Sequence, residues 1–479
     1  MRLGTAAISL FNLSDMKTKK IFFLIAIIVS MSCNNTSPAK DETKLIHLVT
    51  LDPGHFHAAL VQKTMYEDVD SVVHVYAPAG NDLNLHLDRI KGFNERTDQP
   101  THWKEEVYTG NDFFEKMIAE KKAHLNDSVG KGNVVVLAGN NQKKTEYILR
   151  SLEAGFNVLA DKPMVIDNEK FEMLKKAIET AKQKNLLLYD IMTERFEITT
   201  ILQRELSMMP AIFGTLQKGT AYNPAVEMKS EHNFYKYISG NVVIRPGWFM
   251  DASQQGDGIT DVTTHLVDLV QWECFPGQSL DYTKDIAVDS AKRWPTKMTS
   301  SQFKTITKLD NIPPYLEKNK QNDTTINVWS NGEIVYQIKG VHAKVSVRWD
   351  YQTPGGNDTH YSIMRGTKAN LVIRQEAEQQ YKPTLYIEPL LDSSYETILK
   401  ERFKELQTKY PGVDLKKSRK GWEVIIPDKY KEGHEAHFAR VTQNFLEYLK
   451  NKNMPAWEVP NMLAKYFITT KALDIAKQH

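Results

Sequence analysis

The chain has 479 residues, which is long enough for two or three domains. Its hydrophobic content of 41% and charged content of 25% are those of an ordinary globular protein with ample core. The formal net charge is only +2, from 61 basic and 59 acidic residues, so we expect no nucleic-acid partner.

The amino terminus has the pattern of an export signal. A basic stretch at residues 16–20 precedes an apolar run at 21–29, and small residues lead directly to Cys33. These three features are typical of a secretory signal, and the apolar run is too short to span a bilayer comfortably. We therefore expect residues 1–32 to be a leader and signal peptide, with Met16 as a second possible start.

The position of Cys33 resembles the bacterial lipobox, in which the cysteine is lipidated and becomes the first mature residue. The alternative is an ordinary cleavage site beside a free cysteine. Residues 33–44 are small and polar, which suits a flexible tether. We expect an exported protein that meets a bacterial membrane only through its lipid anchor, on the periplasmic or cell-surface side. The one other cysteine, Cys274, permits no disulfide framework.

Residues 45–192 are predicted to form a dinucleotide-binding domain. A strand at 44–51, a turn at Gly54 and a helix at about 58–65 are how a mononucleotide fold begins, with the helix amino terminus facing a pyrophosphate. Gly54 is the only glycine where the GxGxxG pattern would supply three. His55 and Phe56 complete this turn.

Two further features of this region depart from a simple nucleotide site. The second strand, at 71–76, is followed by residues 77–80 (APAG) instead of an acidic ribose ligand; Asp82 and Asn84 lie close enough to replace it. His55 and His57 form an HxH pair, but the sequence offers no third ligand nearby. We therefore predict no metal site.

The most informative stretch is residues 134–164. A buried strand at 134–137 leads into an amphipathic helix that ends at Gly155, and a second strand at 156–160 runs into Asp161-Lys162-Pro163. This βαβ unit places Lys162 beyond the carboxyl end of a parallel strand, where doubly wound sheets bind ligands. The alternative is a solvated loop lysine. We also expect helices at 112–121 and 168–182, a last strand at 186–189, and a loop at 86–103.

Residues 193–479 are predicted to form a second domain. A helix at 202–207 precedes strands at 212–217, 242–244, 324–329, 333–338, 343–349, 360–364 and 369–373. Alternation of Val345, Val347 and Trp349 favours an open, mostly antiparallel sheet with one covered face. Residues 382–429 have few apolar positions and are predicted to be an insertion with a helix at 395–409. Helices at 433–451 and 459–477 close the chain.

A second informative stretch, residues 256–269, is predicted to be a helix entered through a glycine-rich turn. Asp261, His265 and Leu269 would share one face, which lets a carboxylate and an imidazole project together into a cleft. Such a pair suits general acid–base catalysis. The alternative is an aspartate at a helix amino terminus and a core histidine.

Taken together, the two stretches resemble the signatures of the glucose-fructose oxidoreductase / inositol dehydrogenase (Gfo/Idh/MocA) family. Asp161-Lys162-Pro163 is similar to its Glu-Lys-Pro motif, and residues 256–268 to its glycine run followed by Asp-x-x-x-His-x-x-Asp. The resemblance covers residues 45–476 apart from 382–429. It implies an α/β protein with a Rossmann doubly wound parallel sheet and a carboxy-terminal α+β domain, NAD or NADP as cofactor, a carbohydrate substrate and a homo-oligomer.

The resemblance also implies roles for single residues. Lys162 would lie beside the nicotinamide and the substrate hydroxyl, His265 would be the general acid or base, and Asp261 would line the same pocket. Trp248, with Phe249 and Tyr222, could stack on a pyranose ring or lie in the core. The expected cofactor-binding residues are Gly54, His55, Phe56, Asn140, Asp161, Lys162 and Pro163; the expected substrate-binding residues are Arg195, Trp248 and His265.

Three functions follow as hypotheses. The first is an NAD(P)-dependent oxidoreductase acting on a hydroxyl of a sugar, polyol or glycoside, with a cofactor that is loaded before export and then retained. The second is an NAD-dependent glycoside hydrolase that works by oxidation and elimination, without net change in the nicotinamide. The third is a non-catalytic carbohydrate-binding lipoprotein, which would hold no cofactor.

Overall fold

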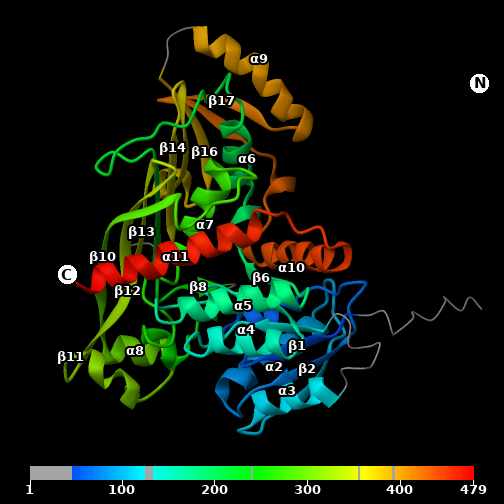
Figure 1. Cartoon of the computed structure of the whole chain (residues 1–479). Helices are drawn as coiled ribbons and strands as arrows, with labels where there is room; N and C mark the ends of the chain where they lie inside the picture. The colour runs from blue at the N-terminus through cyan, green and yellow to red at the C-terminus, as the bar shows by residue number, and fades with distance from the viewer. Residues whose placement is uncertain (1–45, 124–132, 239–240, 354–355, 391–393, 479) are drawn as a thin grey trace, which may run out of the picture. The chain divides into compact units, whose positions relative to one another are not determined.

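The computed structural model describes residues 46–123, 133–238, 241–353, 356–390 and 394–478, which form one compact unit (Figure 1). The predicted signal peptide, Cys33 and the tether lie outside the described residues. Within the described part of the chain, every helix is too short or too polar to cross a bilayer.

The first sheet has six parallel strands in the order β3-β2-β1-β4-β5-β6. This is the order of a doubly wound dinucleotide-binding fold, as predicted. β1, β4, β5 and β6 are buried at every position, because helices cover them. The strands are β1 (Leu48–Leu51), β2 (Val72–Tyr76), β3 (Lys104–Tyr108), β4 (Val134–Leu137), β5 (Asn157–Asp161) and β6 (Leu188–Ile191).

Helices connect these strands, and Gly155, with φ 92°, ends α4 as predicted. The loop predicted at 86–103 is wrong: α2 occupies most of it and β3 follows. Only Leu83, His86 and Ile90 of α2 are buried, so its apolar stripe was too narrow to recognise. The helices are α1 (His57–Val61), α2 (Asn81–Glu95), α3 (Phe113–Ala123), α4 (Lys144–Glu153) and α5 (Phe171–Gln183).

The second sheet has ten strands in the order β10-β12-β13-β7-β14-β15-β16-β18-β17, with β11 beside β12. Every pairing except β13 with β7 is antiparallel, which confirms the mostly antiparallel prediction. Its strands are β7 (Val226–Asn233), β10 (Ile286–Thr299), β11 (Lys320–Asn322), β12 (Thr325–Ile338), β13 (Val341–Asp350), β14 (Thr359–Arg365), β15 (Ala369–Gln375), β16 (Thr384–Pro389), β17 (Asp414–Ser418) and β18 (Gly421–Ile425).

Several predicted boundaries in this sheet were wrong. The two strands predicted at 324–329 and 333–338 are one continuous strand, β12, and the strand predicted at 212–217 is reduced to a single bridge at Leu216. β7 and β10 were not predicted because polar residues occupy many of their positions. The segment 382–429 supplies β16, β17, β18 and α9 (Ser394–Lys409), so it extends the sheet.

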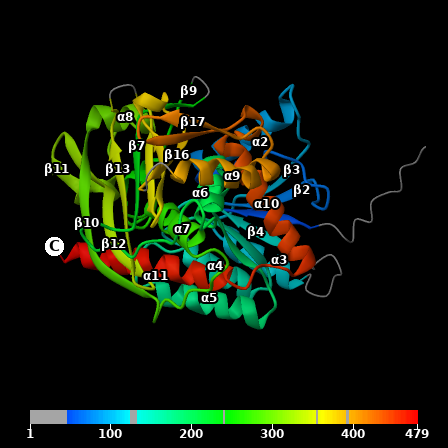
Figure 2. The ribbon, with the colours of Figure 1, turned by 90° about the horizontal axis from the view of Figure 1, so that it is seen from above.

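Helices α6 (Ile198–Ser207), α7 (Thr263–Cys274) and α11 (Glu458–Lys477) pack against this sheet (Figure 2). α10 (His434–Asn451) packs instead on α1 and β6. α11 contributes Tyr466 to the core of the first sheet and Leu473 to the core of the second. This helix therefore packs into the cores of both sheets and joins them.

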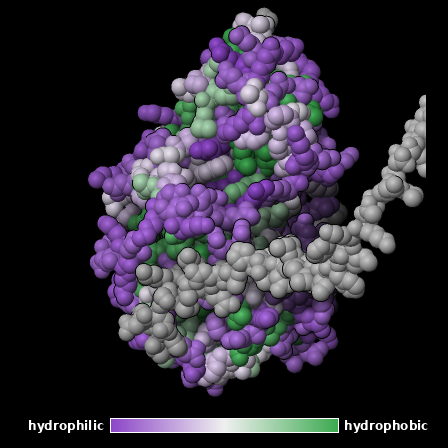
Figure 3. Space-filling view, turned by 90° about the vertical axis from the view of Figure 1, so that its right-hand side faces the viewer, coloured by the Kyte–Doolittle hydropathy of each residue, from purple (hydrophilic) through white to green (hydrophobic). Residues whose placement is uncertain are grey.

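Shorter elements complete the chain: η3 (Thr193–Phe196), β8 (Tyr237–Ile238), β9 (Asn241–Val242), η4 (Gly247–Met250), α8 (Ser300–Thr307), η5 (Pro314–Asn319), η6 (Ala377–Gln379) and η7 (Asp428–Tyr430). On the face shown in Figure 3, hydrophilic side chains predominate and hydrophobic ones form only small patches.

Candidate active site

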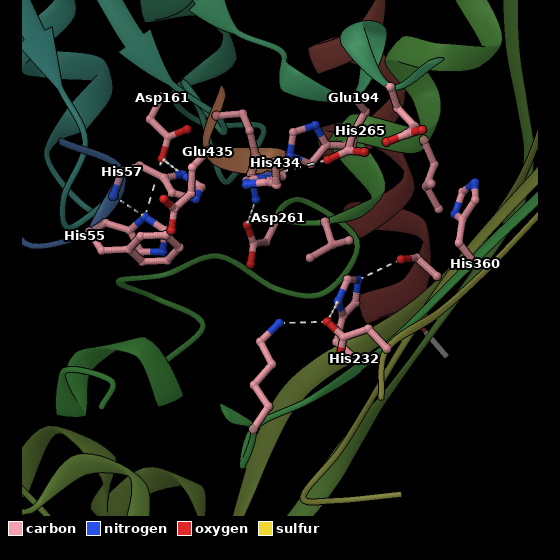
Figure 4. A pocket seen from close by; sticks show the side chains of 18 of the residues that line it. His55, His57, Asp161, Glu194, His232, Asp261, His265, His360, His434 and Glu435 are labelled. Carbon is pink, nitrogen blue, oxygen red and sulfur yellow. Dashed lines mark hydrogen bonds and ion pairs between the residues drawn. The ribbon is translucent and has the colours of Figure 1, made fainter. Parts of the chain in front are cut away.

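A cavity of about 790 Å³ lies between the carboxyl ends of β1, β4 and β5 and the facing surface of β7 and β14. Figure 4 shows that its walls carry an unusual number of ionisable side chains from both sheets. Six histidines line it: His55, His57, His232, His265, His360 and His434. A cavity at the carboxyl edge of a parallel sheet is where ligands bind in this architecture.

The structure brings Lys162 and Asp261 together at the centre of this cavity. Lys162 follows β5, and its Nζ donates to Asp261 Oδ1 over 2.6 Å; Gln255 Nε2 donates to the other carboxylate oxygen over 3.0 Å. Burial acts to raise the pKa of Asp261, but the charge of Lys162 and these two hydrogen bonds lower it overall. Asp261 therefore remains a carboxylate, and the alternative of a solvated loop Lys162 does not hold.

His265 lies in the first turn of α7 and lines the same cavity. The helix begins at Thr263, so Asp261 occupies the turn before it and not the helical position that we predicted. The Nδ1 atom of His265 is buried and has no hydrogen-bond partner among the described residues. Burial, reinforced by the charge of Lys162, lowers the pKa of His265 to about 4. His265 is therefore a neutral imidazole at neutral pH, with a free ring nitrogen.

Asp161 supplies the partner that the HxH pair lacked in the sequence. The Nδ1 atom of His57 donates to Asp161 Oδ2 over 2.9 Å, and His55 Nδ1 lies 3.7 Å from the same oxygen. These three residues have the spacing of a metal site. Burial, together with the positive charge of nearby Lys162, lowers the pKa of both histidines. The same charge would repel a dication bound at this position. The hydrogen bond from His57 therefore fixes the Asp161 carboxylate, and His55 lies beside it.

The far wall of the cavity is formed by β7 and the start of β14. The hydroxyl of Ser230 and Nε2 of His232 are 2.7 Å apart, and His232 Nδ1 donates to Asp358 Oδ2 over 3.3 Å. Lys236 donates to the same carboxylate oxygen over 2.7 Å. His232 also stacks on Trp349 with ring centroids 4.8 Å apart. This wall therefore presents a fixed set of polar groups to a ligand.

A side wall is formed by η3 and the start of α10. His434 Nε2 lies 3.6 Å from Glu194 Oε1 and 3.4 Å from the hydroxyl of Thr193. Burial acts to raise the pKa of Glu194, but the nearby histidines, His434 first, lower it. Glu194 and His434 lie next to His265 in the cavity, so this pair is a further carboxylate–imidazole contact of the lining (Figure 4).

Of the residues predicted to bind the cofactor, His55, Phe56, Asp161 and Lys162 line the cavity, while Gly54, Asn140 and Pro163 do not. Asn140 instead donates to Gln254. The next residue, Asn141, lines the cavity, and its buried Oδ1 has no partner among the described residues. An unused acceptor in the same cavity lining as Lys162 fits the carboxamide or ribose of a nicotinamide cofactor, so the residues present fit the group.

Trp248 of the second domain covers the turn at Gly54. Trp248 donates to Asp82 over 2.8 Å, and a Cβ at Gly54 would lie 3.0 Å from the Trp248 ring and 3.1 Å from Asp82 Oδ2. Burial, with the charge of Asp82, raises the pKa of Asp52 at the end of β1 to about 6. Asp82 thus contacts Trp248, and its predicted role as ribose ligand stays untested.

Arg195 and Trp248 were predicted to bind substrate, but neither lines the cavity. Arg195 donates to Asp268 through two nitrogens, over 2.6 and 2.7 Å, and to Glu458 over 3.0 Å. Asp268 also accepts from Lys465, which in turn pairs with Asp190 at the end of β6. All five side chains are buried. We name them the junction network, because they join β6, η3, α7 and α11.

Sequence reasoning missed the cavity residues that come from the second domain, and Lys63 after α1. They are isolated polar residues without a motif, and only the alternation of polar residues along 226–233 could have indicated a strand facing a cleft. The missed lining residues with ionisable side chains are Lys63, Glu194, Glu197, His232, Lys236, Arg245, Asp358, His360, His434 and Glu435.

Comparisons with known proteins agree with this geometry. The family model described as "Putative oxidoreductase C terminal domain" matches residues 202–477, and the one described as "Oxidoreductase family, NAD-binding Rossmann fold" matches residues 94–190. No curated protein matches the chain. The crystal structure of a "putative oxidoreductase" from Parabacteroides merdae ATCC 43184 has 54% sequence identity and a TM-score of 0.87, over 91% of this chain and 98% of that one.

More distant structures share the fold. A levoglucosan dehydrogenase in complex with NADH and levoglucosan has 12% identity and a TM-score of 0.54, over 90% of this chain and 97% of its own. A 3-ketoreductase from Actinomadura kijaniata in complex with NADP has 13% identity and a TM-score of 0.51, over 88% and 96%. The chain therefore belongs to the Gfo/Idh/MocA oxidoreductases, whose cofactor is NAD or NADP bound by the Rossmann domain.

Proposed function

We propose that this protein is an NAD(P)-dependent oxidoreductase that acts on a hydroxyl of a sugar, polyol or glycoside. The observation that carries the proposal is the meeting of Lys162, Asp261 and His265 in one cavity at the carboxyl edge of the parallel sheet. A carbohydrate substrate is supported by the dehydrogenase solved with levoglucosan, and by a cavity wall of hydrogen-bonding groups.

The cofactor, when bound, accepts or returns a hydride at its nicotinamide ring, and the protein residues handle the proton and the alignment. The Lys162 ammonium, held in place by Asp261, donates a hydrogen bond to the oxygen of the substrate hydroxyl. The neutral His265 accepts the hydroxyl proton at a ring nitrogen. The positive charge of Lys162 stabilises negative charge that develops on the same oxygen.

Retention of the cofactor is the second part of the proposal. The Trp248–Asp82 hydrogen bond closes the two domains over the turn at Gly54. If this turn holds part of the dinucleotide, release of the cofactor would require the Trp248–Asp82 contact to open, which would slow exchange. A retained cofactor would suit a protein that works outside the cytoplasm, where free dinucleotide is scarce.

The test is to denature the purified protein by heat and to analyse the supernatant by mass spectrometry. We expect NAD or NADP at about one equivalent per chain. The native protein is then mixed with sugars, polyols and glycosides while nicotinamide absorbance and products are followed. Oxidation of a hydroxyl supports the proposal. Glycoside cleavage without net nicotinamide change would identify the elimination mechanism, and failure to bind NAD or NADP even when added would contradict both.

Two further proposals concern the setting of the enzyme. We propose that Cys33 carries a lipid anchor on the outer side of a bacterial membrane; radiolabelled palmitate should enter the wild-type chain and not Cys33→Ala. We also propose a homo-oligomer, which light scattering coupled to size-exclusion chromatography would detect. A monomer, or labelling that persists in Cys33→Ala, would contradict the respective proposal.

A further inference from the structure

Arg245 is a buried cation in the wall of the cavity. It precedes η4, is 6% exposed, and packs on two adjacent aromatic rings, with its guanidinium carbon 4.7 Å from the centre of the Phe249 ring and 5.1 Å from that of Trp349. Burial lowers its pKa to about 10, despite the nearby charges of Asp358 and Asp261. It is therefore still protonated at neutral pH, and its charge lies in the same cavity as Lys162 and His265.

Apart from the two rings, which attract the cation, the protein offers this charge only weak hydrogen bonds. Arg245 Nε donates to the carbonyl of Phe234 over 3.3 Å, and Nη2 to that of Asn233 over 3.4 Å, which are long for hydrogen bonds. Among the described residues, no carboxylate lies within ion-pairing distance of it. A buried charge left in this state is costly, because the rings and two long hydrogen bonds replace only part of its lost hydration.

The other cations that line the cavity are all paired. Lys162 pairs with Asp261, Lys236 with Asp358, and Lys63 with Glu435. The carboxylates nearest to Arg245 are thus already engaged, since Asp261 accepts from Gln255 as well as Lys162, and Asp358 accepts from His232 as well as Lys236. Arg245 is therefore the one cationic side chain of the described lining that lacks a carboxylate partner.

We propose that Arg245 binds a carboxylate of the substrate, so that the enzyme acts on an acidic sugar such as a uronic acid or its glycoside. This inference rests on the proposed function and names its substrate class. The planar guanidinium matches a carboxylate through two parallel hydrogen bonds. A phosphate would bring close to two negative charges and need a second cation, but Lys236 is already paired with Asp358. A neutral sugar would leave the buried charge uncompensated.

The test compares matched substrates that differ only at one carbon. Methyl β-D-glucuronide is paired with methyl β-D-glucoside, and methyl α-D-galacturonide with methyl α-D-galactoside. For each pair we measure the shift in melting temperature of the purified protein and kcat/KM for oxidation. We expect the acidic member of at least one pair to stabilise the protein and to exceed its neutral partner by about 30-fold or more in kcat/KM.

Three variants assign the preference to Arg245. Arg245→Gln should remove most of the acid-over-neutral ratio, mainly through KM, and Arg245→Lys should restore part of it because it keeps the charge without the planar fork. Arg348→Gln is the matched control. Arg348 is exposed on β13, next to Trp349, and its replacement should leave the acid-over-neutral ratio unchanged.

The outcomes separate this inference from the proposed function. Oxidation of neutral sugars without an acid preference, or an equal loss for both members of a pair in Arg245→Gln, overturns the inference and leaves the proposed function standing. If the cofactor is bound but no sugar is oxidised, the shifts in melting temperature still test the carboxylate site. Stabilisation by the uronides that is lost in Arg245→Gln supports the site. Equal shifts with the acidic and neutral members of each pair overturn it.

Discussion

Two regions of this molecule bury charged side chains in quite different ways. In the junction network, Arg195, Lys465, Asp190, Asp268 and Glu458 are buried, and each makes at least one short ion pair. In the cavity, Arg245 has no carboxylate partner, and His265 Nδ1 and Asn141 Oδ1 lack hydrogen bonds within the described part of the chain. The first region is complete by itself, whereas the second has unused donors and acceptors.

This difference separates structure from function. A complete network fixes the geometry between β6, η3, α7 and α11, and it has no capacity left to bind a ligand. Unused polar groups in a cavity are costly in the free protein, but a ligand can satisfy them when it binds. The contrast explains why Arg195, which follows the Rossmann domain in sequence, is structural, while Arg245 is available to substrate.

The largest expected effect is on activity at Lys162. Lys162→Met should lower kcat/KM by about 1,000-fold or more, because it removes the group that contacts the reacting oxygen. It also leaves Asp261 buried without its cation, so some stability is lost. The double variant Lys162→Met with Asp261→Asn should recover the melting temperature without recovering activity. Recovery of both would mean that Lys162 acts only through folding.

The next prediction compares Arg195→Met with Arg245→Met in the ligand-free protein. Arg195→Met leaves Asp268 and Glu458 with fewer partners and should cost about 3–5 kcal/mol in the free energy of unfolding. Arg245→Met removes an unpaired charge and should change stability by less than about 1 kcal/mol, or raise it. Denaturant unfolding midpoints measure both. Equal losses would show that Arg245 is compensated in the free protein, contrary to our interpretation.

Much of the fold could be predicted where the burial of an element determines its pattern of apolar residues. β4 and β5 are buried on both faces, so their apolar runs and the cap at Gly155 indicated a parallel βαβ unit. α2 and β10 could not be recognised, because few of their side chains are buried and the period is lost among polar residues. At residues 212–217, Ile212 and Phe213 are buried, but they belong to a turn that ends at Gly214, with φ 78°. The apolar residues there therefore did not indicate a strand.

The site could be predicted only where a motif marks it. Lys162, Asp261 and His265 belong to two recognisable stretches, and the structure places all three in one cavity. The partners of Arg195 lie 73 and 263 residues away, and no local pattern relates them to it. Arg245 stands beside Pro246 and Gly247 without periodicity, so its burial and its missing partner become visible only once Phe249 and Trp349 are in place around it.

A smaller effect on activity concerns the pH dependence set by His265. His265 must be neutral to accept a proton, and burial lowers its pKa to about 4. In the oxidative direction, kcat/KM should therefore vary little between pH 5 and 8 and fall only near pH 4. His265→Gln should lower it by about 100-fold at every pH in this range. An acid limb near pH 6.5 in the wild-type protein would show that the imidazole is not desolvated as the structure indicates.

The smallest expected effect tests whether an unpaired buried group away from the cavity behaves in the same way. His86 in α2 is 2% exposed and neither ring nitrogen has a partner among the described residues. Burial, with the charge of Arg89, lowers its pKa from 6.5 to about 4. Between these values the unfolded chain binds a proton that the folded protein does not, so stability is lost as pH falls from about 6.5 towards 4.

Replacing this histidine should therefore remove part of the acid sensitivity. His86→Leu should lose about 2 kcal/mol less stability than the wild type between pH 8 and pH 5, and the exposed replacement His102→Leu should change nothing. Denaturant unfolding at the two pH values gives both differences. An unchanged acid sensitivity in His86→Leu would mean that His86 gains a partner or water in solution.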